Sequence, residues 1–194
     1  AVQKLLTGAY AGRILRMGVK TVIVGRPNVG KSSLLNALLG TERAIVTDVP
    51  GTTRDVIEEE VSVEGIPLRL IDTAGLRAAE DEVERLGVAR TEQHLGDAEL
   101  VLAVFDSSCG LTDEDREILA RLKTMDANII ILCNKEDCAS VLRVTDFDGL
   151  NAPVLMLSAQ AGTGLDALRE TIAARVRALE GDLGDGALPN KERE

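Results

Sequence analysis

Residues Gly25–Ser32 fit the pattern G-x-x-x-x-G-K-[ST] and lie between a strand-like segment and a helix-like segment. The β-branched run Val19–Val24 before them is typical of a buried strand, and Lys31–Leu39 after them has apolar residues at helical spacing. A strand, a glycine loop and a helix in this order predict a phosphate-binding loop (P-loop). In such a loop, backbone N–H groups and the positive end of the helix face phosphate oxygens. A glycine turn without a function is the alternative, but it does not require Lys and Ser at the last two positions.

Three side chains would contact the phosphates or the Mg²⁺ ion bound to them. Lys31 would place its charge between the β- and γ-phosphates, and the Ser32 hydroxyl would ligate Mg²⁺. The stretch Asp72-Thr73-Ala74-Gly75 ends an apolar strand and matches D-x-x-G, in which Asp72 would hold Mg²⁺ through a water and the Gly75 N–H would reach the γ-phosphate. Such a tetrapeptide is weak evidence alone, but its position roughly 40 residues after the P-loop supports the assignment.

Two further motifs predict that the base is guanine. Asn134-Lys135-Glu136-Asp137 follows an apolar strand and matches N-K-x-D, in which the Asp137 carboxylate would accept hydrogen bonds from guanine N1–H and the 2-amino group. Adenine offers neither donor at that place. Lys135 would stack on the base, and Asn134 would tie the loop to its neighbours. Ser158-Ala159-Gln160 matches an S-A-x loop whose backbone N–H contacts the guanine carbonyl. Either motif alone fits a charged turn, but their order at successive strand ends predicts a GTP site.

The remaining pattern alternates strands with helices. Val56–Val63 alternates apolar and charged residues, and Ile66–Ile71 follows across a Glu64-Gly65 turn, so these two predict an antiparallel hairpin. We therefore expect an α/β fold of the P-loop NTPase (Ras-like GTPase) type, in three layers, with a mixed six-stranded sheet and helices on both faces. Further strands are expected at 99–105, 128–133 and 153–157, and further helices at about 82–95, 112–123 and 164–179.

Length and composition limit the domain organisation and the kinds of partner that we expect. The chain has 194 residues, which suits one domain at 18–179, with a helical stub at 1–17 and a linker that leads into a second flanking segment at 180–194. The formal net charge of −10 and the three aromatic residues argue against direct binding of nucleic acid. Three cysteines without metal-like spacing suit reduced thiols. With neither an apolar run long enough to cross a bilayer nor a signal peptide, we expect a cytoplasmic protein without a membrane contact.

Hydrolysis is the least determined step. Many GTPases orient the attacking water with Gln directly after D-x-x-G, but here that position is Leu76. An acidic cluster, Glu80–Glu84, follows and would either supply the missing role or start a helix with solvated carboxylates. Arg26, Arg54 and Arg77 would each offer charge to the γ-phosphate or lie on the surface.

Four segments together resemble the G domain of the tRNA-modification GTPase family MnmE (TrmE): Gly25–Asn36, Ala44–Asp55, Asp72–Arg77 and Asp81–Gly87. The resemblance covers roughly residues 15–178 and implies that the chain is the GTPase module of a longer protein. It also implies site residues beyond those that the motifs give. Thr53 would ligate Mg²⁺ beside Ser32, and the catalytic residues would be Glu84, which orients the attacking water, with Lys31 and Arg77. The K⁺ ligands would be Asn28, Thr47, Val49 and Thr52. The nucleotide would also contact Val29, Gly30, Ser33, Asp48, Pro50, Gly51, Thr73 and Ala74.

The resemblance further implies how the activity is used. GTP is hydrolysed to GDP with Mg²⁺ and K⁺ when two G domains meet across their switch faces as a homodimer. The hydrolysis serves modification at carbon 5 of the tRNA wobble uridine together with the flavoprotein MnmG, and the tRNA is bound by other parts of the full-length protein. Two alternatives stay open: a Der-like ribosome-assembly GTPase, and a slow GTP-binding switch that needs a partner.

Overall fold

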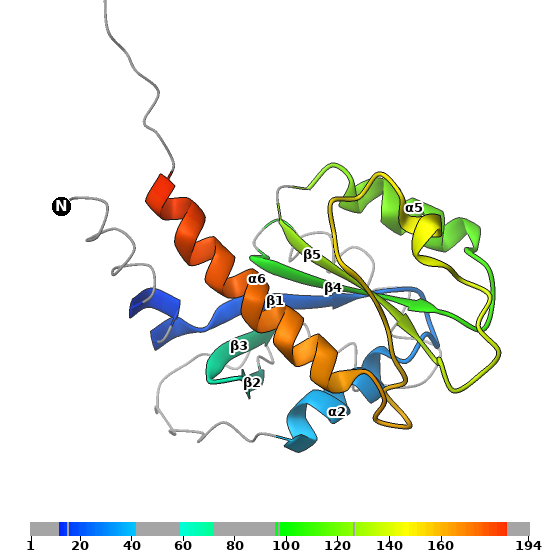
Figure 1. Cartoon of the computed structure of the whole chain (residues 1–194), viewed down its shortest axis with the longest axis horizontal. Helices are drawn as coiled ribbons and strands as arrows, with labels where there is room; N and C mark the ends of the chain where they lie inside the picture. The colour runs from blue at the N-terminus through cyan, green and yellow to red at the C-terminus, as the bar shows by residue number, and fades with distance from the viewer. Residues whose placement is uncertain are drawn as a thin grey trace, which may run out of the picture.

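The computed structural model describes residues 12–14, 16–41, 59–71, 96, 98–125 and 127–185. Their strands form one six-stranded sheet in the order β2-β3-β1-β4-β5-β6 (Figure 1). The β2–β3 pair is antiparallel and every other pair is parallel, so the predicted mixed sheet and its hairpin are confirmed. The strands are β1 (Val19–Val24), β2 (Glu59–Val63), β3 (Ile66–Ile71), β4 (Leu100–Asp106), β5 (Asn128–Asn134) and β6 (Val154–Met156).

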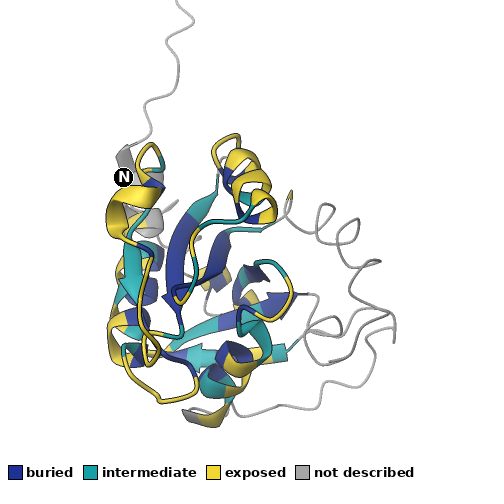
Figure 2. Ribbon diagram, turned by 90° about the vertical axis from the view of Figure 1, so that its right-hand side faces the viewer, coloured by how far each residue is buried: buried dark blue, intermediate teal, exposed yellow. Residues whose placement is uncertain are grey.

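Alternate side chains of the central strands bury against opposite faces of the sheet. On one face, Leu100, Leu102 and Val104 of β4 pack in a cluster with residues of α2 (Lys31–Thr41) and α6 (Leu165–Asp185). On the other face, Val101, Ala103 and Phe105 pack in a second cluster with residues of α5 (Asp113–Leu122) and the 3₁₀ helix η1 (Val144–Phe147). Figure 2 shows the buried strands between exposed helix surfaces. Because β4 is buried on both faces, it is apolar from Leu100 to Phe105, as expected for a central parallel strand, and only its last residue, Asp106, is charged.

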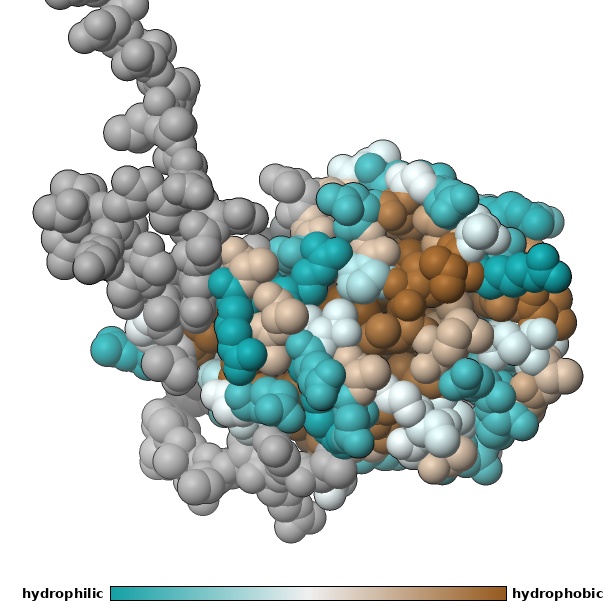
Figure 3. Space-filling model, in the orientation of Figure 1, coloured by the Kyte–Doolittle hydropathy of each residue, from teal (hydrophilic) through white to brown (hydrophobic). Residues whose placement is uncertain are grey.

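The helices that flank the strands have clear local causes. Helix α5 starts after Thr112, whose hydroxyl accepts from the Asp115 N–H while the Asp115 carboxylate accepts from the Thr112 N–H, a capping box. Helix α6 follows Gly164, whose φ of +76° and close approach to the Met156 carbonyl exclude a side chain there. This helix continues to Asp185, six residues beyond the end predicted at 179. Figure 3 shows hydrophilic side chains along its outer surface and a hydrophobic area beside it.

The amino-terminal helical pattern is described only in part. Residues 12–14, 16 and 17 are helical, and the Gly18 N–H donates to the Ile14 carbonyl with a φ of +69° at Gly18, which ends the helix before β1 as predicted. The strand residues expected at 56–58, the helix at 82–95 and the tail beyond 185 lie outside the described residues. Within the described part of the chain, no helix has both the length and the apolar character needed to cross a bilayer.

Candidate functional site

Three predicted motifs lie at one edge of the sheet. The P-loop follows β1, the N-K-x-D loop begins at the end of β5, and the S-A-x loop follows β6. The strands β1, β4, β5 and β6 run parallel, so their carboxyl ends share this edge. Ligands of open α/β sheets bind in the crevice beyond the carboxyl ends of the strands. The arrangement therefore places the phosphate motif beside the two base motifs, as the sequence predicted.

The P-loop backbone curls through conformations that favour glycine. Gly25 has a φ of +154°, and a Cβ there would lie 2.4 Å from the Val104 carbonyl oxygen. Gly30 has a φ of +100°, and its Cβ would lie 2.1 Å from Asn134 Nδ2. Asn28 also has a positive φ, 62°, and is exposed, while the Val29 side chain is fully buried and anchors the loop in the core. Both glycines are thus required by the close approach of a neighbouring segment, β4 at Gly25 and Asn134 at Gly30, as well as by their φ values.

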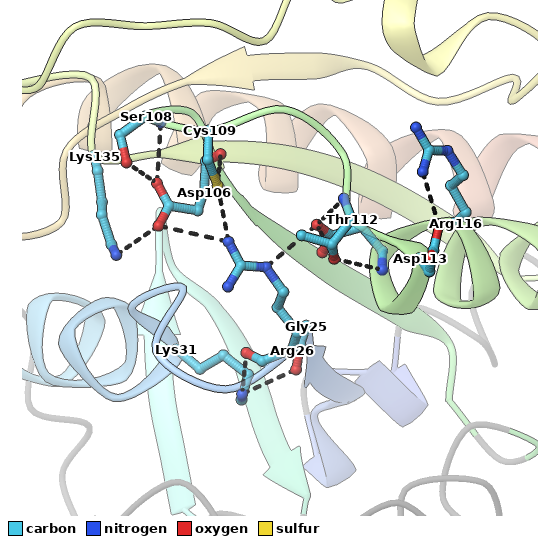
Figure 4. Close-up of polar contacts among 11 residues, drawn as sticks. Gly25, Arg26, Lys31, Asp106, Ser108, Cys109, Thr112, Asp113, Arg116 and Lys135 are labelled. Atoms are coloured by element: carbon cyan, nitrogen blue, oxygen red, sulfur yellow. Dashed lines mark hydrogen bonds and ion pairs between the residues drawn. The ribbon is translucent and has the colours of Figure 1, made fainter.

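Lys31 and Ser32 open α2 directly after this curl. The Lys31 ammonium donates to the carbonyl oxygens of Gly25 and Arg26, at 2.9 and 2.8 Å, so its charge lies over the loop (Figure 4). Ser32 is half-buried in the first turn and Ser33 is exposed. These residues fit a bound triphosphate and Mg²⁺, since the cradle combines a cation, a hydroxyl ligand and a helix N-terminus without room for side chains at either glycine.

Asn134 joins all three loops. Its side chain is 3% exposed. Its Nδ2 donates to the Val29 carbonyl at 2.8 Å, and its Oδ1 accepts from the Ala159 N–H at 2.9 Å. A further bond, from the Glu136 N–H to the Leu157 carbonyl at 3.1 Å, holds the N-K-x-D loop against the end of β6. The predicted role of Asn134 as the tie between neighbouring loops therefore has a definite geometry.

The S-A-x loop is closed by its own backbone. The Ser158 N–H donates to the Thr163 carbonyl at 3.0 Å, and the Ser158 hydroxyl accepts from the Ala161 N–H at 3.0 Å. The Ala159 N–H is bonded to Asn134. Ser158 and Ala159 thus shape the loop with their N–H groups, and the exposed Gln160 follows them at its rim. The Ser158 and Ala159 N–H groups are therefore bonded within the protein, and the contact of this loop with a base carbonyl stays a prediction.

Lys135 has a partner that the motif did not predict. Its ammonium donates to Asp106 Oδ2 at 2.7 Å, and its backbone φ is +68°. Asp106, the last residue of β4, also accepts from the Ser108 N–H at 3.0 Å and the Ser108 hydroxyl at 2.6 Å through Oδ1. Burial alone would raise the pKa of Asp106, but the hydrogen bonds from Lys135 and Ser108 outweigh it, and the pKa lies below its ordinary value of 3.8. The ionised carboxylate therefore stabilises the fold at neutral pH, and this contribution is lost as the pH falls through the lowered pKa.

The contacts of the Arg26 side chain differ from those that the sequence analysis considered for it. Its Nε donates to Asp115 Oδ2 at 3.2 Å, and its Nη2 lies 2.9 Å from Cys109 Sγ and 3.7 Å from Asp106 Oδ2. Figure 4 shows the guanidinium turned toward the start of α5. The interpretation of Arg26 as a source of charge for the γ-phosphate is therefore not supported, and neither is a simple surface position, because its side chain is only 19% exposed.

Several predicted residues lie outside the described part of the chain. They include the catalytic Glu84 and Arg77, the cation Arg54, the whole D-x-x-G motif and the loop expected to hold both ions. In full, these are Thr47, Asp48, Val49, Pro50, Gly51, Thr52, Thr53, Arg54, Asp72, Thr73, Ala74, Gly75, Arg77 and Glu84. Of the predicted ion ligands, Ser32 and Asn28 are described, and both lie in or directly after the P-loop.

Comparison with proteins of known sequence finds similarity to tRNA modification GTPases. The sequence is 49% identical over 177 residues to the tRNA modification GTPase MnmE of Natranaerobius thermophilus, covering 90% of this chain and 38% of that protein. It is 52% identical over 174 residues to MnmE of Bacillus licheniformis, covering 88% of this chain and 37% of that protein. The chain thus spans less than two fifths of these relatives' length.

Solved structures and a family model agree with the fold. The G domain of the T. maritima FeoB iron transporter superposes with a TM-score of 0.57 at 30% identity, covering 81% of this chain and 98% of that domain. A family model described as 50S ribosome-binding GTPase matches residues 20–135, from β1 through the start of the N-K-x-D motif. The predicted fold and the predicted enzyme class are thereby confirmed. Since this match spans more than half of the sequence, the chain belongs to that family of GTPases.

Proposed function

We propose that this GTPase is specific for guanine, requires Mg²⁺, is stimulated by K⁺ and is activated when two G domains dimerise through their switch faces. We further propose that it works in the cytoplasm within a longer protein that modifies carbon 5 of the tRNA wobble uridine with the flavoprotein MnmG. The similarity to MnmE proteins supports the tRNA role. The single observation that carries the site is Asn134, which fixes the P-loop and both base loops to one another.

The described residues suit distinct parts of one nucleotide. The P-loop N–H groups, Lys31 and the start of α2 would hold the phosphates, and Ser32 would supply one hydroxyl ligand to Mg²⁺. Bound Mg²⁺ would neutralise charge on the β- and γ-phosphates. Asp137, two residues after Lys135, is exposed, so its carboxylate would be accessible to the guanine edge. Thr53, Asp72 and Glu84 are proposed for the second hydroxyl ligand, the water-mediated Mg²⁺ contact and the attacking water.

Changing Asp137 to Asn tests the base assignment. The carboxylate would accept from guanine N1–H and the 2-amino group, whereas an amide presents a donor in place of one acceptor. We expect GDP affinity to fall at least about thirtyfold, from the loss of charge-assisted bonds of about 1.5–3 kcal/mol. Affinity for xanthosine diphosphate should rise, because its C2 oxygen accepts the new donor. Calorimetric titration of both nucleotides measures the switch, and GDP affinity equal to that of the unchanged protein would remove Asp137 from base recognition.

The turnover of GTP against protein concentration tests the dimer mechanism. In K⁺ we expect the rate per molecule to rise steeply with concentration, and in Na⁺ at equal ionic strength to stay low and flat. A cation beside the phosphates can replace an arginine finger, a contribution of about 10³–10⁵ in rate in other GTPases. In the same assay, Glu84→Ala should keep GDP affinity while turnover falls about 10²–10⁴-fold.

The same assay separates the alternatives. A turnover rate per molecule that is the same in K⁺ and Na⁺ and at every protein concentration would overturn the K⁺-dependent dimer mechanism. It would leave the proposal of GTP binding intact. The slow switch that needs a partner would then be favoured, as would a Der-like role. Wild-type turnover in the Glu84→Ala protein would instead remove that residue from the mechanism alone.

A further inference from the structure

The Asp106 carboxylate lies between two loops that bind the nucleotide. Its Oδ2 accepts from Lys135 of the N-K-x-D loop at 2.7 Å and lies 3.7 Å from Arg26 Nη2 of the P-loop. Its Oδ1 accepts from the Ser108 N–H and hydroxyl, so both oxygens are used (Figure 4). The side chain is 9% exposed, at the end of a strand whose other residues are fully buried and apolar. Because both of its oxygens are bonded and its side chain is nearly buried, the Asp106 carboxylate can hold a bonded cation in a fixed position.

We propose that Asp106 is a positioning residue for guanine binding, which acts through Lys135 by holding its ammonium so that the side-chain stem is ordered before the base arrives. The proposal rests on the proposed guanine specificity of the N-K-x-D loop. It concerns a residue outside the P-loop, D-x-x-G, N-K-x-D and S-A-x motifs.

The geometry of Lys135 supports this role. Its backbone has a φ of +68° and its side chain remains 35% exposed, although its ammonium is bonded to a nearly buried carboxylate. The aliphatic stem therefore runs from the N-K-x-D backbone to the end of β4 and is held at both ends. A lysine side chain is among the most flexible, and ordering it on binding would reduce affinity. With the ammonium already fixed, a base that packs on the stem meets an ordered surface.

Arg26 depends on Asp106 much less than Lys135 does. The guanidinium is closer to Asp115, at 3.2 Å, and Asp115 is 2% exposed. Removing the charge of Asp106 would therefore leave Arg26 with its main partner and leave Lys135 without the contact that fixes it. The proposal thus predicts a loss in base binding, with phosphate binding preserved.

The test is a double-mutant cycle on GDP affinity with Asp106→Asn and Lys135→Met. Each single variant is expected to weaken GDP binding about tenfold, equal to about 1.4 kcal/mol. The double variant should be no weaker than Lys135→Met, because Asp106 acts only through Lys135. Affinity for tripolyphosphate, which has no base, should stay within about twofold of the unchanged protein in Asp106→Asn. Asp113→Asn, which removes the same charge from an exposed carboxylate paired with Arg116, is the matched control and should bind GDP normally.

Thermal unfolding of each variant without nucleotide checks that it folds, and Asp106→Glu, which keeps the carboxylate, should restore at least part of the GDP affinity. If Asp106→Asn does not fold, Asp106→Ser, which also removes the carboxylate, replaces it in the cycle with Lys135→Met, and losses of GDP affinity that simply add overturn the proposal. Additive losses in the original cycle, or an equal loss of tripolyphosphate affinity, would overturn it as well. A failure of the proposed guanine specificity looks different, since the unchanged protein would then bind ADP as tightly as GDP.

Discussion

Replacing Gly30 with alanine is expected to weaken GDP binding at least about a hundredfold, equal to about 2.7 kcal/mol. The backbone φ of +100° is strained for any residue with a Cβ, and the added Cβ would lie 2.1 Å from Asn134 Nδ2. Since that amide donates to the Val29 carbonyl, the methyl group would displace the bond that holds the P-loop to the N-K-x-D loop. Losing one buried bond of this kind costs about 1–3 kcal/mol, and the P-loop would move away from the base site.

Gly162 offers a matched control for that substitution. It has a φ of +79°, yet a Cβ placed there meets nothing within 4 Å. Gly162→Ala should therefore suffer backbone strain of about 1–2 kcal/mol without disturbing a contact. Calorimetric GDP titration and thermal unfolding of both variants separate strain from collision. A Gly30→Ala protein that binds GDP no worse than Gly162→Ala would contradict the tight approach of the two loops.

The spacing of apolar residues predicted the strands and helices of the fold, because each of these elements follows from a local pattern in the sequence. β1 and β3 begin and end at the residues expected from their apolar runs, and α5, Asp113–Leu122, lies within one residue of the bounds predicted at about 112–123. Composition misled at α6, where the Gly- and Asp-rich residues after 179 suggested a linker while the helix continues to Asp185. A glycine in a helix interior costs only about 1 kcal/mol relative to alanine, which does not by itself end a long helix.

The motifs predicted a set of nucleotide-binding residues, which stays a prediction, but they did not predict which side chains hold these residues in place. The tie from Asn134 was expected in kind, because the N-K-x-D motif predicted that its Asn ties the loop to its neighbours. The partners of Lys135 and Arg26 were not expected. Asp106 is 29 residues before Lys135 and Asp115 is 89 residues after Arg26, and no spacing rule joins such pairs. One signal was present: Asp106 ends an otherwise apolar strand at the carboxyl edge where the motifs meet.

Asn134→Ala is expected to have the largest effect on folding and binding together. Both polar atoms of this side chain are bonded in the interior, to the Val29 carbonyl and the Ala159 N–H. Alanine would leave both partners unsatisfied, so the free energy of unfolding should fall by about 2–4 kcal/mol. GDP affinity should fall at least about tenfold in the fraction that remains folded, because the P-loop and the S-A-x loop would no longer share an anchor.

Two further variants make this result specific. Asn134→Asp keeps an acceptor for the Ala159 N–H but turns a carboxylate oxygen toward the Val29 carbonyl, so it should loosen the P-loop while sparing the S-A-x loop. Asn36→Ala, at an exposed position of α2, should change neither stability nor affinity. Urea unfolding gives the stability of each protein, and GDP titration gives its affinity. If Asn134→Ala binds GDP as tightly as Asn36→Ala, the three loops are held in place by their own backbones, and the anchoring role of Asn134 is wrong.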